Sequence, residues 1–393
     1  MLFSNEEKII CLLSRLEPSE EDIERTRSIA ASSEPAIDHE RVMRTASLNG
    51  VAPLLYNNLK DRGIFPEEVL SRLRTAYLHS VAGNLRKGKE LAGLLALLKK
   101  SGIEAIPVKG VVASELIFEN PGFYYGSDID ILVRPADVQS TKRILIDSGY
   151  IYNEENEQDM LSSHYHLVFQ NERHLVEVHW NLVKRYFKVP AEFWWEDVYE
   201  EQYDGRKVWC LAPEKYLICA IFRLFSHMYR PLKFFVLVSE ICNKYYDRID
   251  WLRFTQFIKK HGMEKVAIFT LRLSNELLGT KVPNGIKDRN VIGYALFRRS
   301  AINSLFKDAK RPFASKLLYI FLLGSSYRIL RHFLMRIFPQ RGELRLRYGI
   351  PAGSKTLPFY YALNPILLPF LVLRKRFSPP FLRNSRPRQD NIT

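Results

Sequence analysis

The sequence predicts an α+β protein in which a small mixed sheet is flanked by N-terminal and C-terminal helical regions. Two patterns support this prediction. Residues 1–102 and 211–285 carry apolar side chains at helical spacing. Residues 103–210 instead alternate short β-branched runs with helical stretches, and then end on two strand-like runs. The expected element order is therefore β-α-β-α-β-β, which builds a mixed sheet.

Both helical regions contain recognisable start and end signals. Ser19 precedes three acidic residues, a pattern that marks the first turn of a helix. Gly102 stands where a helix end favours a left-handed residue. Pro213 suits the first turn of the helix that opens the second helical region. Because nothing in residues 1–102 suggests chemistry, we interpret that region as a packing or lid region.

The central region contains four expected strands, each a short apolar run bounded by a turn. They are residues 103–110, 127–133, 164–170 and 174–183. Helices are expected between the first three strands, at 111–120 and 135–150. The second of these helices has proline at its start and glycine near its end, which is the usual asymmetry.

Residues 286–393 form a separate C-terminal region, which is basic and aromatic-rich and ends in a tail expected to be disordered. Residues 281–393 contain 22 Lys and Arg against 4 Asp and Glu, whereas the other 280 residues contain 36 against 39. A near-neutral body thus precedes a strongly positive end. This asymmetry indicates a polyanionic partner, which is either an anionic membrane surface or a nucleic acid. Among nucleic acids, RNA is the candidate partner.

Two apolar stretches of the C-terminal region bear on that choice. Residues 315–338 mix an apolar run with Arg328, Arg331 and Arg336, as helices at a membrane interface do. Residues 356–373 are uncharged over 18 positions, which only approaches the ~20 residues of a spanning helix. Three prolines would also disturb that helix. Interfacial binding, membrane spanning and burial in a soluble core stay open as alternatives.

The four cysteines, Cys11, Cys210, Cys219 and Cys242, are scattered and include no pair at CxxC spacing. A disulfide framework and a zinc site are therefore not expected. The opening residues, MLFSNEEKII, lack the basic and apolar segments of a signal peptide. We expect a cytoplasmic protein whose C-terminal region is able to attach peripherally to the inner face of a membrane.

The run GSDIDILV places two aspartates one residue apart in an apolar strand. Asp128 and Asp130 therefore share one face of that strand, and Glu177 and His179 share a face of the strand at 174–183. If these strands are neighbours, three carboxylates converge and repel one another unless a cation neutralises them. Carboxylate oxygens suit Mg²⁺ or Mn²⁺. We therefore predict that the partner of the aspartates is a metal ion rather than a basic side chain.

The order of three motifs, PVKG, GSDIDILV with its helix up to DSGY, and VEVHWNL, resembles a known family. The chain is similar to the uncharacterised nucleotidyltransferases of the DNA-polymerase-beta-like superfamily. The resemblance continues through SEICNKYYDRIDW and LRLSNELLGTKVP and covers roughly residues 40–285. It implies a nucleotidyltransferase core at 103–210. It also implies transfer of a nucleotidyl group from an NTP, expected to be ATP, to a hydroxyl-bearing acceptor with release of pyrophosphate.

The resemblance also implies roles for individual residues. Asp128 and Asp130 match the metal-binding DxD pair, and Glu177 matches the third acidic position, which helps to activate the attacking hydroxyl. Two metal ions held there would bridge the phosphates. Lys109 and Gly110 stand where the wider superfamily has Gly-Ser, which holds the triphosphate. The expected catalytic and metal-binding residues are Asp128, Asp130 and Glu177, and the expected nucleotide contacts are Lys109, Gly110, Ser127 and His179.

The chain departs from the family pattern at two places, and these departures leave alternatives open. Lys-Gly replaces Gly-Ser, and Phe123, Tyr124 and Tyr125 stand where related chains often carry an arginine. A degenerate fold that binds a nucleotide, RNA or a protein without turnover is the first alternative. An enzyme acting on tRNA ends, suggested by the basic end of the chain, is the second. His164 and His166 are candidate substrate contacts but are not assigned as metal ligands.

Overall fold

The computed structural model describes residues 3–33, 35–152, 165–184, 187–203, 205–289, 293–306, 313–339, 341–351 and 354–377. These residues fall into two compact units, one up to Ser325 and one from Ser326 onward. The expected α+β class is confirmed, because helices surround a small mixed sheet in the first unit. The finer division of the chain at residues 102, 210 and 285 stays a prediction.

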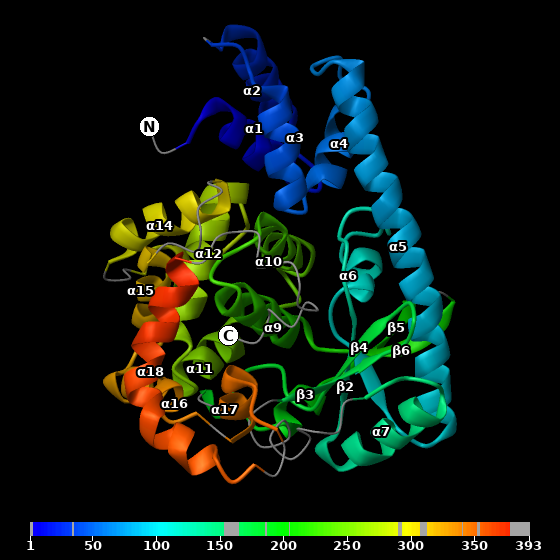
Figure 1. Ribbon diagram of the computed structural model, residues 1–393. Helices are drawn as coiled ribbons and strands as arrows, with labels where there is room; N and C mark the ends of the chain where they lie inside the picture. The colour runs from blue at the N-terminus through cyan, green and yellow to red at the C-terminus, as the bar shows by residue number, and fades with distance from the viewer. Residues whose placement is uncertain are drawn as a thin grey trace. The chain divides into compact units, whose positions relative to one another are not determined.

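Five helices precede the sheet, as expected for a helical N-terminal region (Figure 1). They are α1 (Asn5–Leu13), α2 (Glu20–Ser32), α3 (His39–Leu48), α4 (Ala52–Leu59) and α5 (Glu67–Lys100). The Ser19 hydroxyl accepts a hydrogen bond from the Asp22 N–H, which caps α2 as its sequence predicts. Gly102 follows α5 with a φ of +75°, the left-handed conformation expected there.

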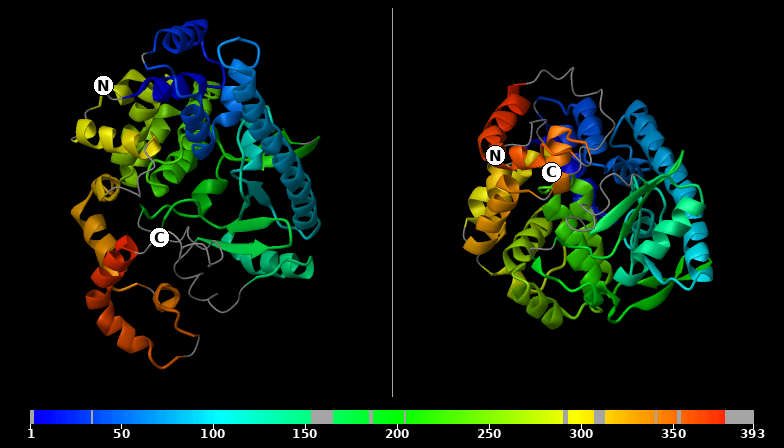
Figure 2. Two further views of the ribbon diagram at one scale, coloured as in Figure 1. Left: turned by 45° about the horizontal axis from the view of Figure 1, so that its top comes forward. Right: turned by 60° about the horizontal axis from the view of Figure 1, so that its bottom comes forward.

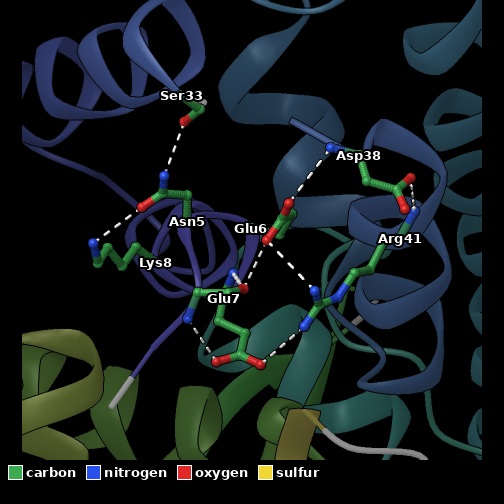
Figure 3. Close-up of polar contacts among 8 residues, drawn as sticks. Asn5, Glu6, Glu7, Lys8, Ser33, Asp38 and Arg41 are labelled. Carbon is green, nitrogen blue, oxygen red and sulfur yellow. Dashed lines mark hydrogen bonds and ion pairs between the residues drawn. The ribbon is translucent and has the colours of Figure 1, made fainter. Parts of the chain in front are cut away.

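Polar contacts fasten the first three helices to one another (Figure 3). The Asn5 amide donates to the Ser33 hydroxyl at 3.0 Å. Arg41 of α3 reaches two carboxylates of α1, at 3.8 Å from Glu6 and 3.3 Å from Glu7. These contacts join helices rather than line a site, which agrees with the structural role expected for this region.

The sheet has four strands in the order β1-β2-β4-β3. They are β1 (Ala105–Pro107), β2 (Ile129–Val133), β3 (His166–Gln170) and β4 (Leu175–His179). Strand β2 is antiparallel to β1 and parallel to β4, and β4 is antiparallel to β3. Helices α6 (Val111–Leu116) and α7 (Val138–Asp147) separate the first three strands along the chain. The predicted element order and the mixed sheet are therefore confirmed.

A second sheet, which the sequence analysis did not predict, follows the first. Strands β5 (Tyr199–Tyr203) and β6 (Arg206–Cys210) pair as an antiparallel hairpin. The run YEEQY lacks a clean apolar alternation, so its periodicity gave no strand signal. The long helix α5 runs beside the strands in all three views (Figure 1, Figure 2).

Helices complete the first unit after the hairpin. They are α9 (Pro213–Ser226), α10 (Leu232–Lys244), α11 (Trp251–Lys260), α12 (Glu264–Leu278), α13 (Asn284–Lys287), α14 (Tyr294–Phe306) and α15 (Phe313–Leu322). Pro213 occupies the first turn of α9 as predicted. Helices α9, α10 and α12 pack against one another, and the apolar faces of α9 and α10 are almost wholly buried.

The second unit contains α16 (Ser326–Ile337), α17 (Arg341–Tyr348) and α18 (Leu357–Phe377). Its small core consists of Leu344, Ile350 and Leu357. Among the described residues, no helix combines the length and the apolar character needed to cross a membrane. The tail expected to be disordered, residues 378–393, lies outside the described residues.

Candidate active site

The three carboxylates expected to converge lie together where β2 and β4 run side by side. Asp130 is paired directly with Glu177 in the parallel register of the two strands, and Asp128 immediately precedes β2. Each of the three side chains has a carboxylate oxygen within 4.8 Å of the others. The alternation argument therefore placed these side chains correctly, because parallel pairing keeps both strand faces in register.

Asp130 is the most enclosed member of this group, with a relative exposure of 3%. The Lys109 ammonium donates a hydrogen bond to its Oδ1 at 2.8 Å, and Nε2 of His179 lies 2.8 Å from the same oxygen. Burial opposes ionisation, but the charge of Lys109 and the hydrogen bond from His179 hold the pKa of Asp130 well below its usual value. The expectation that no basic side chain would face the aspartates is therefore wrong for Asp130.

Asp128 has the opposite electrostatic environment. Its hydrogen-bond partner is the exposed Ser127, whose hydroxyl donates to Oδ1 at 3.1 Å. Burial, together with the neighbouring charge of Asp130, raises the pKa of Asp128. The two aspartates therefore differ in their charge environment. Lys109 neutralises Asp130, whereas the ionised form of Asp128 would be stabilised by any further positive charge nearby.

His179 connects two of the three acidic positions through a single ring nitrogen. Its Nε2 lies 3.2 Å from the Glu177 carboxylate as well as 2.8 Å from Asp130. His166, on the neighbouring strand β3, forms a second group with Glu177 and His179 whose ligand atoms also lie within 4.8 Å of one another. The structure therefore places His166 at the site, whereas His164 lies outside the described residues.

Two glycines bring the turn after β1 close to the DxD strand. Gly110 has a φ of +55°, and a Cβ added there would lie 2.9 Å from the Asp128 carbonyl oxygen. A Cβ added at Gly126 would lie 2.5 Å from the Cα of Gly110. Only glycine permits this approach of two backbones. Gly110 was singled out from the sequence; Gly126 was missed, although it opens the same GSDIDILV motif.

Two cationic residues near the site were also missed. Arg223 of α9 has Nη1 at 3.9 Å from Asp130 Oδ2, and the ammonium of Lys233 on α10 donates to the Tyr125 carbonyl at 2.9 Å. One feature of the sequence could have identified Arg223. Arg223 interrupts the apolar run CAIFRLF, and a charge in a buried helical run requires a partner.

We predict that replacing each aspartate by asparagine affects stability differently. Asp130→Asn removes the counter-charge of the half-buried Lys109 ammonium, so the free energy of unfolding should fall by about 3 kcal/mol. Asp128→Asn removes a carboxylate that its neighbour repels, so the free energy of unfolding should stay the same or rise. Urea unfolding of both variants measures the difference. An Asp130→Asn variant as stable as wild type would contradict the pairing with Lys109.

Comparison with known proteins places this arrangement in a family. The model of a family described as uncharacterised nucleotidyltransferase matches residues 35–279. Comparisons with curated proteins and with solved structures gave no match. The matched segment begins before α3, includes both sheets and ends just after α12. Because it covers more than half of the sequence, the chain belongs to this family of uncharacterised nucleotidyltransferases.

Proposed function

We propose that this protein transfers a nucleotidyl group from an NTP, with ATP as the first candidate, to a hydroxyl-bearing acceptor. The observation that carries the proposal is the convergence of Asp128, Asp130 and Glu177 within 4.8 Å, in a chain whose family is one of nucleotidyltransferases. In this reaction the acceptor oxygen bonds to the α-phosphorus of the nucleotide. The bond from that phosphorus to the bridging oxygen breaks, and pyrophosphate leaves.

The three carboxylates fit a divalent cation, Mg²⁺ or Mn²⁺. They offer hard oxygen ligands, and the buried Oδ2 of Asp130 has no hydrogen-bond partner in the described part of the chain. Asp128 is held beside a like charge, and binding of a cation would relieve that repulsion. When bound, such a cation would lower the pKa of the acceptor hydroxyl and neutralise charge on the phosphates.

The remaining site residues supply position and proton transfer. Glu177 is the proposed acceptor of the hydroxyl proton, because its side chain keeps 22% exposure while its partner carboxylate Asp130 is enclosed. His179 contacts both carboxylates and fixes the orientation of Glu177. Gly110 permits close approach of a phosphate to the backbone. The Lys109 ammonium and the exposed Ser127 hydroxyl, which donate to Asp130 and Asp128, are further proposed nucleotide contacts.

A second candidate function is nucleotide binding without turnover. The observation that favours it is the ion pair between Lys109 and Asp130, with Nζ 2.8 Å from Oδ1. This pair neutralises the central aspartate with a side chain of the protein itself. The two functions differ in one product, pyrophosphate, which only the enzyme releases.

We predict that wild type releases pyrophosphate from an NTP in the presence of Mg²⁺ and an acceptor, and that Asp128→Asn reduces the rate by at least about 100-fold. The reason is that several kcal/mol of metal electrostatics correspond to two or more powers of ten in rate. Pyrophosphate release is measured with each NTP, and mass spectrometry of candidate acceptors identifies the product. Asp147→Asn is the matched control, because Asp147 is an exposed aspartate at the end of α7.

Thermal unfolding of the same samples separates the two candidate functions. Wild type stabilised by Mg²⁺ and NTP, but without pyrophosphate release for any acceptor, would favour the binding protein over the enzyme. Wild type that gains no thermal stability and releases no pyrophosphate would contradict both functions.

The C-terminal unit supports a separate proposal, peripheral binding to an anionic membrane face. Helix α16 carries large apolar side chains that are exposed in the structure. They are Tyr327, Leu330, Phe333, Leu334, Met335 and, one residue beyond the helix, Phe338. The same helix carries Arg328, Arg331 and Arg336, and the surrounding region carries the large excess of Lys and Arg. An exposed apolar face beside positive charge suits a helix lying in the interface of an anionic bilayer.

We predict that the full chain floats with vesicles containing anionic phosphatidylserine at low salt but not with neutral phosphatidylcholine vesicles. A double substitution, Leu330→Ser with Leu334→Ser, should abolish flotation because it removes the centre of the apolar face. Leu252→Ser is the control, because Leu252 is 71% exposed on α11, outside the C-terminal unit. If the protein floats with neither kind of vesicle but binds RNA in a filter assay with a salt-dependent affinity, the partner of the positive region is RNA instead.

A further inference from the structure

Three positive side chains from the helical regions receive little compensation from carboxylates among the described residues: one has a carboxylate oxygen at 3.9 Å, and the other two form no ion pair. This cationic group consists of Arg223 on α9, Lys233 on α10 and Lys87 on α5. It is separate from Lys109, whose ammonium is engaged by Asp130. The three residues come from helices far apart in the sequence, so the packing of those helices around the sheet gathers their charges in one place.

Arg223 is enclosed but its hydrogen-bonding capacity is largely unused. Its side chain keeps 15% exposure, and its nearest carboxylate oxygen, Oδ2 of Asp130, lies at 3.9 Å. Its buried Nε has no hydrogen-bond partner in the described structure. The guanidinium carbon lies 4.9 Å from the centre of the Phe234 ring, a favourable cation–π contact. The planar guanidinium carries a set of donors suited to an anion.

Lys233 and Lys87 are compensated even less than Arg223, because within the described part of the chain their ammonium groups contact only carbonyls and aromatic rings. The Lys233 ammonium donates to the Tyr125 carbonyl at 2.9 Å and lies 5.7 Å from the Tyr124 ring centre. Burial and the charge of Arg223 lower the pKa of Lys233 to about 8. The Lys87 ammonium lies 4.0 Å from the Tyr125 ring centre and donates to the Gly83 carbonyl at 3.3 Å. Across the described residues, neither lysine forms an ion pair with a carboxylate.

Unpaired buried charges destabilise a folded protein unless a ligand compensates them. Asp130 does not require Arg223 as its partner, because Lys109 and His179 already contact it at 2.8 Å. A divalent cation on the carboxylates would leave the cationic group as a further excess of positive charge. That excess suits a multiply charged anion, such as a chain of phosphates, and arginine and lysine are the side chains that bind phosphate most strongly.

We infer that Arg223 and Lys233 form a polyphosphate subsite that takes the triphosphate of the nucleotide, with Lys87 adding long-range attraction. The identification of the ligand as a nucleotide rests on the proposed function. In this arrangement the sheet supplies the carboxylates and α9 and α10 supply the donors to the phosphates. Residues of the helical region would thus hold the triphosphate, the role that the Gly-Ser turn has in the wider superfamily and that is altered to Lys-Gly here.

The probe is inorganic tripolyphosphate, titrated calorimetrically into the full chain in EDTA so that the carboxylates hold no metal. We expect wild type to bind it, Arg223→Met and Lys233→Met each to weaken binding by about 10-fold, and Arg223→Lys to weaken it less. These factors correspond to the loss of one charge-assisted hydrogen-bonding group. Arg74→Met, an exposed arginine of α5, removes the same net charge and should leave binding unchanged. Melting temperatures of all variants establish that each is folded.

Binding that is absent in wild type, or equal in wild type and the two methionine variants, would overturn the subsite. NTP that fails to displace tripolyphosphate would overturn the assignment to a nucleotide. The KM for NTP separates this inference from the proposed function. If folded Arg223→Met turns over NTP with an unchanged KM, the subsite alone is contradicted. If NTP competes with tripolyphosphate at these residues but wild type releases no pyrophosphate, nucleotidyl transfer alone is contradicted.

Discussion

The buried carboxylate of Asp130 is the constraint on which the rest of the site depends. It joins the turn after β1, through Lys109, to β4, through His179, with both contacts at 2.8 Å. Taking such a pair out of water costs several kcal/mol per ion, and apolar side chains of similar volume would often be at least as stable. A protein that keeps this polar group at the centre of an apolar sheet keeps it at a cost in stability. Functional sites are where such costs are expected.

Opposite charges at the site come from different parts of the fold. Strands β2 and β4 supply the three carboxylates, whereas α9 and α10 supply Arg223 and Lys233. The family match spans both parts, because the matched segment includes the strands as well as α9 and α10. The C-terminal unit lies beyond the matched segment, and it carries the exposed apolar side chains of α16 on which the membrane proposal rests.

Strand alternation predicted which acidic side chains share a face, and the parallel pairing of β2 with β4 brings them together. Asp130 and Glu177 lie within apolar strands, and Asp128 immediately precedes β2, two residues before Asp130. The period of a strand fixes the face of each side chain. The element order followed from the same alternation and from turn residues such as Pro135. The hairpin at 199–210 could not be predicted in this way, because its strands are polar and their pairing, rather than an apolar face, defines them.

The cationic half of the site could not be predicted from local patterns. Arg223 lies 93 residues after Asp130 in the sequence, and its place beside that aspartate depends on how α9 packs against the sheet. Periodicity assigns such a residue to a helix but not to a partner. The prediction that a metal alone would face Asp130 failed for the same reason: the sequence gives no register between Lys109 in the turn after β1 and the aspartate on β2.

The central claim is that the three carboxylates bind a divalent cation together with a nucleotide, and anomalous diffraction tests it most directly. Crystals grown with Mn²⁺ and a non-hydrolysable NTP analogue would be measured at the manganese absorption edge. The account predicts an anomalous peak in contact with Asp128, Asp130 and Glu177, with the phosphates of the analogue on the side of Arg223. The account would be contradicted by crystals in which the analogue binds elsewhere. In those crystals the carboxylates would hold no manganese, and Lys109 would still be paired with Asp130.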